Sequence, residues 1–93
     1  MKKVIFVGAG EYAESVYDSM SKKKYDLIGF VDDIKTGSHM GRPIIASRIE
    51  QVPNFREYAY FISVGDTEPR KRLFEEVKRL GLETINIIDK TAM

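Results

Sequence analysis

An apolar run that ends at a glycine constrains the fold of this chain most strongly. Residues 4–7 (VIFV) are consecutive and apolar, and Gly8 follows them directly. Such a run, without polar alternation, is typical of a strand buried on both faces, as in a parallel sheet. After the glycines, Ala13, Val16 and Met20 recur at helical spacing. The sequence therefore predicts a buried strand, a tight turn and an amphipathic helix.

The same alternation of strand and helix continues along the chain. Further strands are predicted at residues 26–31 (DLIGFV), 58–64 (YAYFISV) and 84–88 (TINII), with a short edge strand in RPIIAS at 42–47. Asp66 or Thr67 begins a second predicted helix, with Pro69 in its first turn and Gly81 after its end.

This element order predicts one domain, residues 1–93, with an α/β fold. We expect a small Rossmann-like three-layer domain with a four-stranded parallel sheet in the order 2-1-3-4. The chain would then step to one side of the first strand and cross back to the other side, which makes a switch point between the first and third strands. Ligands bind at the carboxyl ends of strands beside such a switch point. The loops expected at this edge are 8–13, 32–33 and 65–68.

The turn after the first strand matches a nucleotide-binding fingerprint. Residues 8–13 (GAGEYA) fit the pattern G-x-G-x-x-A, in which glycines permit a tight turn and close approach of a phosphate. Asp32 lies 24 residues after Gly8, where a carboxylate can accept hydrogen bonds from ribose hydroxyls. The alternative is that the glycines only turn the chain and the aspartates face water. Glu11 counts against a diphosphate at this turn because its charge would repel one.

Composition excludes several classes of site. The formal net charge of +1 does not suit an electrostatic nucleic-acid binder. The chain has no cysteine, and His39 is its single histidine, so we expect no metal site and interpret His39 as a solvated loop residue. No apolar run approaches the roughly 20 residues that span a bilayer, so we expect no membrane insertion and a cytoplasmic protein.

The segments VIFVGAGEYA, LIGFVDD, GRPII and FISVGDTEPRKRLFEEVKRLGLETINIIDKTA resemble, in this order, one known family. It is the N-terminal domain of bacterial sugar O-acyltransferases, the sialic acid O-acetyltransferase and UDP-amino-sugar N-acetyltransferase group. The resemblance covers nearly the whole chain. Its most specific parts are the Asp32-Asp33 pair and a VG(D/N)xxxR turn that contains Gly65, Asp66 and Arg70.

This resemblance implies a substrate domain of a sugar acetyltransferase in surface polysaccharide or glycan biosynthesis. It implies binding of a UDP-linked amino sugar, with acetyl-CoA, the catalytic base and the homotrimer assigned to a left-handed β-helix. The residues that would bind the nucleotide sugar are Gly8, Ala9, Gly10, Tyr12, Asp32, Asp33, Gly65, Asp66, Glu68 and Arg70.

Two departures from the family pattern matter. The family usually has glycine and histidine where this chain has Glu11 and Tyr12, and hexapeptide repeats are absent from these 93 residues. We therefore expect no catalytic residue and no cofactor on this chain, and no acyl transfer by it alone. Two other functions stay open: an NAD(H)-binding module of a dehydrogenase or redox sensor, and an interaction module without a ligand.

Overall fold

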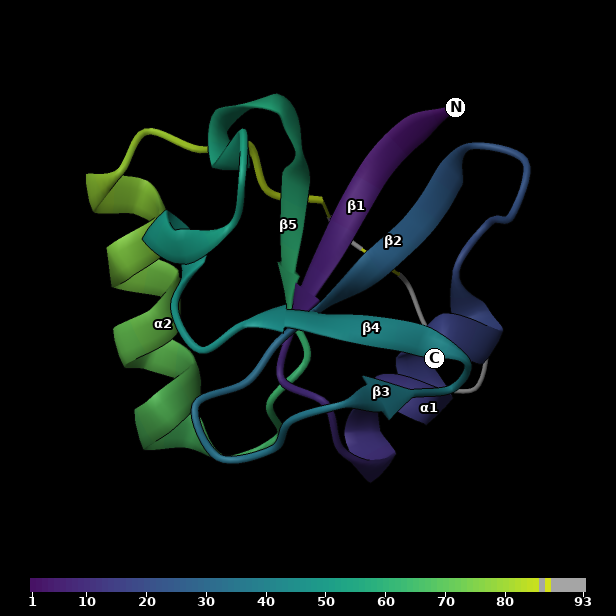
Figure 1. Ribbon diagram of the computed structural model, residues 1–93, viewed down its shortest axis with the longest axis horizontal. Coiled ribbons are helices and arrows are strands. Elements are labelled where there is room, and N and C mark those ends of the chain that lie inside the picture. The colour runs from purple at the N-terminus through teal and green to yellow at the C-terminus, as the bar shows by residue number, and fades with distance from the viewer. Residues whose placement is uncertain (86, 88–93) are drawn as a thin grey trace.

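The chain folds around a five-stranded sheet with one α-helix on each face (Figure 1). The computed structural model describes residues 1–85 and 87 of the 93. The elements are β1 (Lys2–Val7), α1 (Glu11–Ser19), β2 (Tyr25–Val31), β3 (Ser38–His39), β4 (Arg42–Ala46), two 3-10 helices (Ile49–Gln51 and Phe55–Glu57), β5 (Ala59–Ile62) and α2 (Thr67–Arg79).

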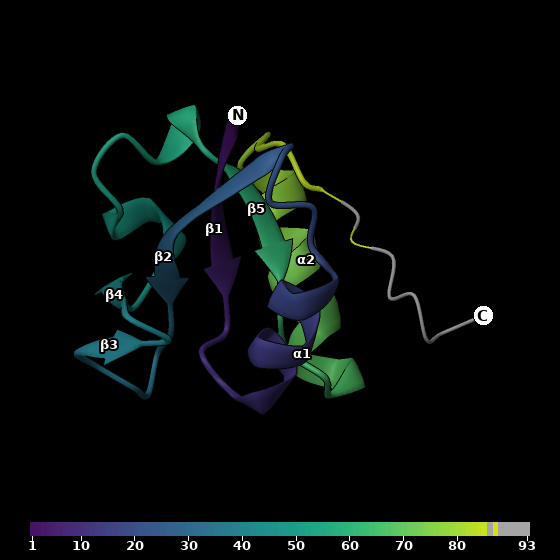
Figure 2. The same cartoon turned by 90° about the vertical axis from the view of Figure 1, so that its right-hand side faces the viewer.

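Alternate residues of the segment 4–7 of β1 pack into two cores, which is why this part of the strand is apolar, whereas Lys2 and Lys3 at its start are exposed. Val4 and Phe6 belong to the core beneath α1. Ile5 and Val7 belong to the core beneath α2, which Val77 supplies from that helix. All four β1 residues are buried. The predicted three-layer arrangement is therefore observed, and Figure 2 shows β1 running between β2 and β5.

The predicted sheet was wrong in strand number and in its purely parallel pairing. The observed order is β3-β4-β2-β1-β5, in which β3 pairs antiparallel with β4 while the other pairs are parallel. β4 lies within the predicted RPIIAS segment, but it is not an edge, because a hairpin from residues 38–39 covers it. Met40 and Gly41 form the two-residue turn, both with positive φ (52° and 75°), as tight hairpins require.

The last predicted strand is only partly testable. Thr84 makes a single parallel bridge to Tyr60, next to β5, where the predicted order placed a fourth strand. Residues 86 and 88 of that predicted strand lie outside the described residues.

The second predicted helix is confirmed as α2. It begins after Asp66, although the Asp66 side chain makes no capping hydrogen bond. Gly81, with φ of 70°, reverses the backbone at the other end, where the Leu82 amide donates to the Val77 carbonyl oxygen. These two ends fix which residues of α2 face the sheet.

Candidate functional site

The turn after β1 is held tightly against β5. Gly8 has a φ of 117°, and its amide donates to the Val31 carbonyl oxygen at 2.8 Å. A Cβ at Gly8 would lie 2.7 Å from Cγ2 of Val64 and 2.9 Å from the carbonyl oxygen of Ser63. The buried Ser63 hydroxyl donates to the Gly8 carbonyl oxygen at 2.6 Å. Glycine is therefore required here by conformation and by space.

Asp32 closes the same turn from the end of β2. Its Oδ2 accepts the Ala9 amide at 2.9 Å, and its Oδ1 accepts the amides of Ile34 and Lys35 at 2.9 and 2.8 Å. Lys35 Nζ donates to the Ala9 carbonyl oxygen at 2.8 Å. Partial burial disfavours ionisation of Asp32, but these three amides and the Lys35 charge outweigh it and hold the Asp32 pKa below its ordinary value.

His39 lies against the glycine turn, so its interpretation as a solvated loop residue was wrong. Its Nε2 is 3.2 Å from the Gly10 carbonyl oxygen and 3.9 Å from a Glu14 carboxylate oxygen. The ring packs edge-on against Phe30, and its side chain is 20% exposed. The β3–β4 hairpin delivers it there, and that hairpin was not predicted. His39 thus supports the backbone of the turn.

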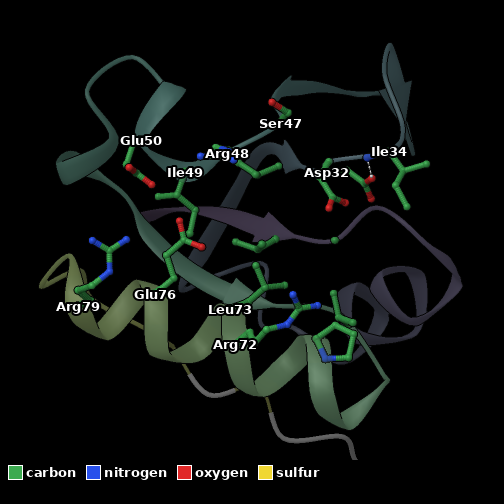
Figure 3. A pocket seen from close by; sticks show the side chains of 16 residues that line it. Asp32, Ile34, Ser47, Arg48, Ile49, Glu50, Arg72, Leu73, Glu76 and Arg79 are labelled. Atoms are coloured by element: carbon green, nitrogen blue, oxygen red, sulfur yellow. Dashed lines mark hydrogen bonds between the residues drawn. The ribbon is translucent and has the colours of Figure 1, made fainter.

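A cavity of about 830 Å³ opens at the carboxyl ends of β1 and β2, between α2 and the 3-10 helix Ile49–Gln51 (Figure 3). Its walls combine apolar and charged side chains. The lining residues are Val7, Gly8, Val31, Asp32, Asp33, Ile34, Ser47, Arg48, Ile49, Glu50, Val64, Pro69, Arg72, Leu73, Glu76 and Arg79. Its location agrees with the expected switch point at β1, where β2 lies on one side of the strand and β5 on the other.

A pair of carboxyl groups occupies one end of this cavity. Glu76 of α2 has Glu50 as a side-chain hydrogen-bond partner. Burial, this hydrogen bond and the Glu50 charge raise the Glu76 pKa, against the opposing charges of Arg79 and Arg48. Figure 3 shows the two carboxyl groups together, with Arg79 beside them. Of the three arginines that line the cavity, Arg48 and Arg79 therefore interact with the Glu76 carboxyl group.

The predicted site residues fall into three groups. Gly8, Asp32 and Asp33 line the cavity. Ala9 and Gly10 belong to the turn, and Tyr12 begins the adjoining turn of α1 with its ring about 3.8 Å from a Cβ built on Gly65. Gly65, Asp66, Glu68 and Arg70 are exposed and lie outside the cavity lining.

The charged residues of the cavity wall were not identified from the sequence. They are Arg48, Glu50, Arg72, Glu76 and Arg79. Helical spacing holds a signal for part of this set. Arg72, Glu76 and Arg79 recur at intervals of four and three residues, so they share one face of α2. Arg70 is two positions from Arg72, which turns it roughly 200° around the helix.

Among residues 1–85 and 87, no group of three or more histidine, cysteine, aspartate or glutamate side chains is arranged to hold a metal ion. None of the helices in this described part is both long and apolar enough to cross a bilayer.

Comparisons with known proteins identify the family. The PglD N-terminal domain model matches residues 3–77. The acetyltransferase domain of PglB from Neisseria gonorrhoeae FA1090 has a similar structure, with a TM-score of 0.81 and 25% identity over 97% of this chain. The same domain in complex with acetyl coenzyme A gives a TM-score of 0.73 and 25% identity over 87%.

A protein sequence from Acanthamoeba polyphaga mimivirus, named uncharacterized protein L142, is 29% identical over 96% of this chain. The chain spans 18% of that protein, and 45% and 40% of the two PglB structures. The resemblance to an N-terminal domain of sugar acetyltransferases is confirmed, and the chain belongs to the PglD N-terminal domain family.

Proposed function

We propose that the chain is the nucleotide-sugar-binding domain of a sugar acetyltransferase, with a UDP-linked amino sugar as its ligand. The observation that carries this proposal is the cavity at the carboxyl ends of β1 and β2, where the glycine turn and the Asp32-Asp33 pair meet. Its family and its similarity to an acetyltransferase domain support the same function. Glycan biosynthesis in the cytoplasm is the proposed setting.

The shape and lining of the cavity suit a nucleotide sugar. Ligand sites commonly measure about 300–1,000 Å³, and this cavity measures about 830 Å³. Ile34, Val64 and Leu73, which are not buried, provide apolar surface on which a planar base can pack. Polar side chains stand around that surface and can recognise hydroxyl and phosphate groups.

The two neighbouring aspartates have different roles in this proposal. Asp32 accepts three backbone amides, so its carboxylate positions the turn. Asp33 is exposed and also lines the cavity, and within residues 1–85 and 87 no hydrogen bond or ion pair is recorded for it. We assign recognition of nucleoside hydroxyl or base N–H groups to Asp33, because an ionised carboxylate is a strong acceptor.

Acetyl transfer itself is assigned to the β-helical part of the family, together with acetyl-CoA binding and trimer formation. We place no catalytic residue and no acetyl-CoA site on the described residues. The domain's contribution in this proposal is to select the nucleotide sugar and hold it.

Calorimetric titration with UDP, a UDP-N-acetyl-amino sugar and NAD tests the proposal. We expect both UDP ligands to bind and NAD not to bind. Asp33→Ala should weaken UDP binding about tenfold or more, because a hydrogen bond to a charged group is lost. Asp66→Ala is the matched control, since Asp66 is exposed and lies outside the cavity. Binding of NAD alone would support the dinucleotide alternative, and absence of all binding would support an interaction module.

A further inference from the structure

The first two amides of the glycine turn are already engaged within the protein. The Gly8 amide donates to Val31 and the Ala9 amide donates to Asp32, at 2.8 and 2.9 Å. The ammonium group of Lys35 donates to the Ala9 carbonyl oxygen. A phosphate that bound to these two amides would have to displace these bonds, so this part of the fingerprint's anion site is occupied from within.

Negative charge also surrounds the start of α1. Glu11 and Glu14 lie in the first turn of that helix, and ionised Asp32 lies beside the turn. Gly10 and Glu11 do not line the cavity. An anionic ligand in the cavity therefore gains little from the helix dipole and faces like charges there.

Arg72 lies on the wall of the cavity that α2 forms, and within the described part of the chain its guanidinium has no acidic partner. Arg48 and Arg79 both act on the Glu76 carboxyl group, whereas no hydrogen bond or ion pair is recorded for Arg72 among residues 1–85 and 87. Figure 3 shows the Arg72 guanidinium extending from α2 toward the strand ends and Asp32. Pro69 and Leu73 line the cavity on either side of it, so this face of α2 is fixed toward the hollow.

We infer that Arg72 binds the phosphates of the nucleotide ligand and that the glycine turn does not. This inference rests on the proposed function. It assigns the nucleoside and the diphosphate of the ligand to residues on two different walls of the cavity. Asp33 takes nucleoside groups at the sheet edge, and Arg72 takes the diphosphate from α2. A guanidinium is always charged, and its planar N–H pairs match phosphate oxygens in a bidentate arrangement.

The test titrates the full chain and two variants with UDP, uridine and inorganic pyrophosphate. Arg72→Ala should weaken UDP binding about tenfold to a hundredfold and leave uridine binding unchanged. Arg70→Ala removes the same charge two residues away, outside the cavity, and should leave both affinities unchanged. Arg72→Lys should keep part of the UDP affinity, because it retains the charge without the bidentate geometry.

The outcomes separate this inference from the proposed function. UDP binding that Arg72→Ala leaves unchanged, or that Arg70→Ala weakens equally, would overturn the role of Arg72 while the proposed function stands. Arg72-dependent binding of pyrophosphate without any uridine or UDP binding would support the anion site and contradict the proposed function. No binding of any of the three compounds would overturn both.

Nuclear magnetic resonance separates the two candidate phosphate sites directly. On addition of UDP, the side-chain Nε–H signal of Arg72 should shift, while the backbone amide signals of Gly8 and Ala9 should move little. Large shifts of those two amides with an unchanged Arg72 signal would place the phosphates on the glycine turn and overturn the inference.

Discussion

The two sides of the sheet at the end of β1 differ in how their polar groups are used. On the side of α1, the glycine turn is closed by hydrogen bonds with the side chains of Asp32, which accepts, and of Lys35 and His39, which donate. The hollow recorded along α1, beside Tyr12, measures about 50 Å³. On the side of α2, a cavity of about 830 Å³ is lined by charged side chains, among which Arg72 has no hydrogen bond or ion pair within residues 1–85 and 87.

This difference teaches which side serves stability and which is available to a ligand. Paired polar groups in a partly buried turn make a rigid structure, and another molecule that binds there has to compete with those bonds. Charged groups around an open cavity keep their capacity to bind a ligand, at the cost of repulsion between neighbours such as Glu50 and Glu76. Mutations on the closed side should therefore change stability, and mutations on the open side should change binding.

The largest expected effect comes from Gly8→Ala on the closed side. The new Cβ would clash with Val64 and Ser63, and the backbone would keep a positive φ that alanine disfavours. We expect a loss of about 3 kcal/mol in the free energy of unfolding, measured by urea denaturation.

The second glycine of the fingerprint provides the matched control. Gly10 has a φ of −131°, and a Cβ there would have no atom within 4 Å. Gly10→Ala should therefore cost at most about 1 kcal/mol, the usual range for a helix N-cap. Equal losses in the two variants would contradict the view that only Gly8 is fixed by packing.

A smaller loss of stability is expected for Asp32→Ala. The change leaves the amides of Ala9, Ile34 and Lys35 without their acceptor, so we expect a loss of about 2 kcal/mol at pH 7. Asp33→Ala, at the exposed neighbour, should stay within about 0.5 kcal/mol of the wild type. Denaturation of both variants measures this, and similar losses would show that Asp32 does not close the turn.

The pH dependence of the Asp32 variant sharpens this comparison. The folded state holds the Asp32 pKa below its ordinary value of 3.8, so the unfolded chain binds the proton more readily. The stabilisation is therefore fully present above pH 3.8 and is lost as the pH falls through the folded pKa. The gap between wild type and Asp32→Ala should narrow under acid, and a constant gap would contradict the ionic contribution.

The main elements of the fold could be predicted because their signals are local. The apolar run at 4–7 and the Pro69-to-Gly81 helix pattern each specify one element. The β3–β4 hairpin could not be predicted in this way. Its turn contains Met40 at positive φ, a conformation that methionine rarely adopts and that only the pairing of β3 with β4 stabilises.

The glycine turn and the aspartate pair of the candidate site were predictable from the sequence, and the charged wall that α2 supplies was not. The fingerprint placed Gly8 and Asp32 correctly at the strand ends, since a contiguous motif carries that information. Arg72 carries no motif, and it reaches the cavity only because α2 packs on the sheet through Leu73 and Val77. The prediction of Arg70 followed a family pattern, which does not specify the helix face, and it stays a prediction.

The smallest expected effect is a gain in stability on the open side. Burial, the hydrogen bond with Glu50 and the Glu50 charge raise the Glu76 pKa above its ordinary value of 4.5. The folded state thus binds this proton more readily, and stability is lost as the pH rises from 4.5 through the raised pKa. Glu76→Gln removes that loss, so the variant should be more stable than the wild type at pH 7 and not at pH 4.

Solvent screening limits this gain to about 0.5 kcal/mol, or about 2–4 °C in melting temperature for a domain of this size. Glu75→Gln is the control, since Glu75 is exposed on α2 outside the cavity. A gain in stability that is independent of pH, or that Glu75→Gln reproduces, would show that repulsion between Glu50 and Glu76 does not destabilise the fold. A gain specific to Glu76 at neutral pH would mean that the open side retains an unfavourable charge arrangement, which the closed side does not.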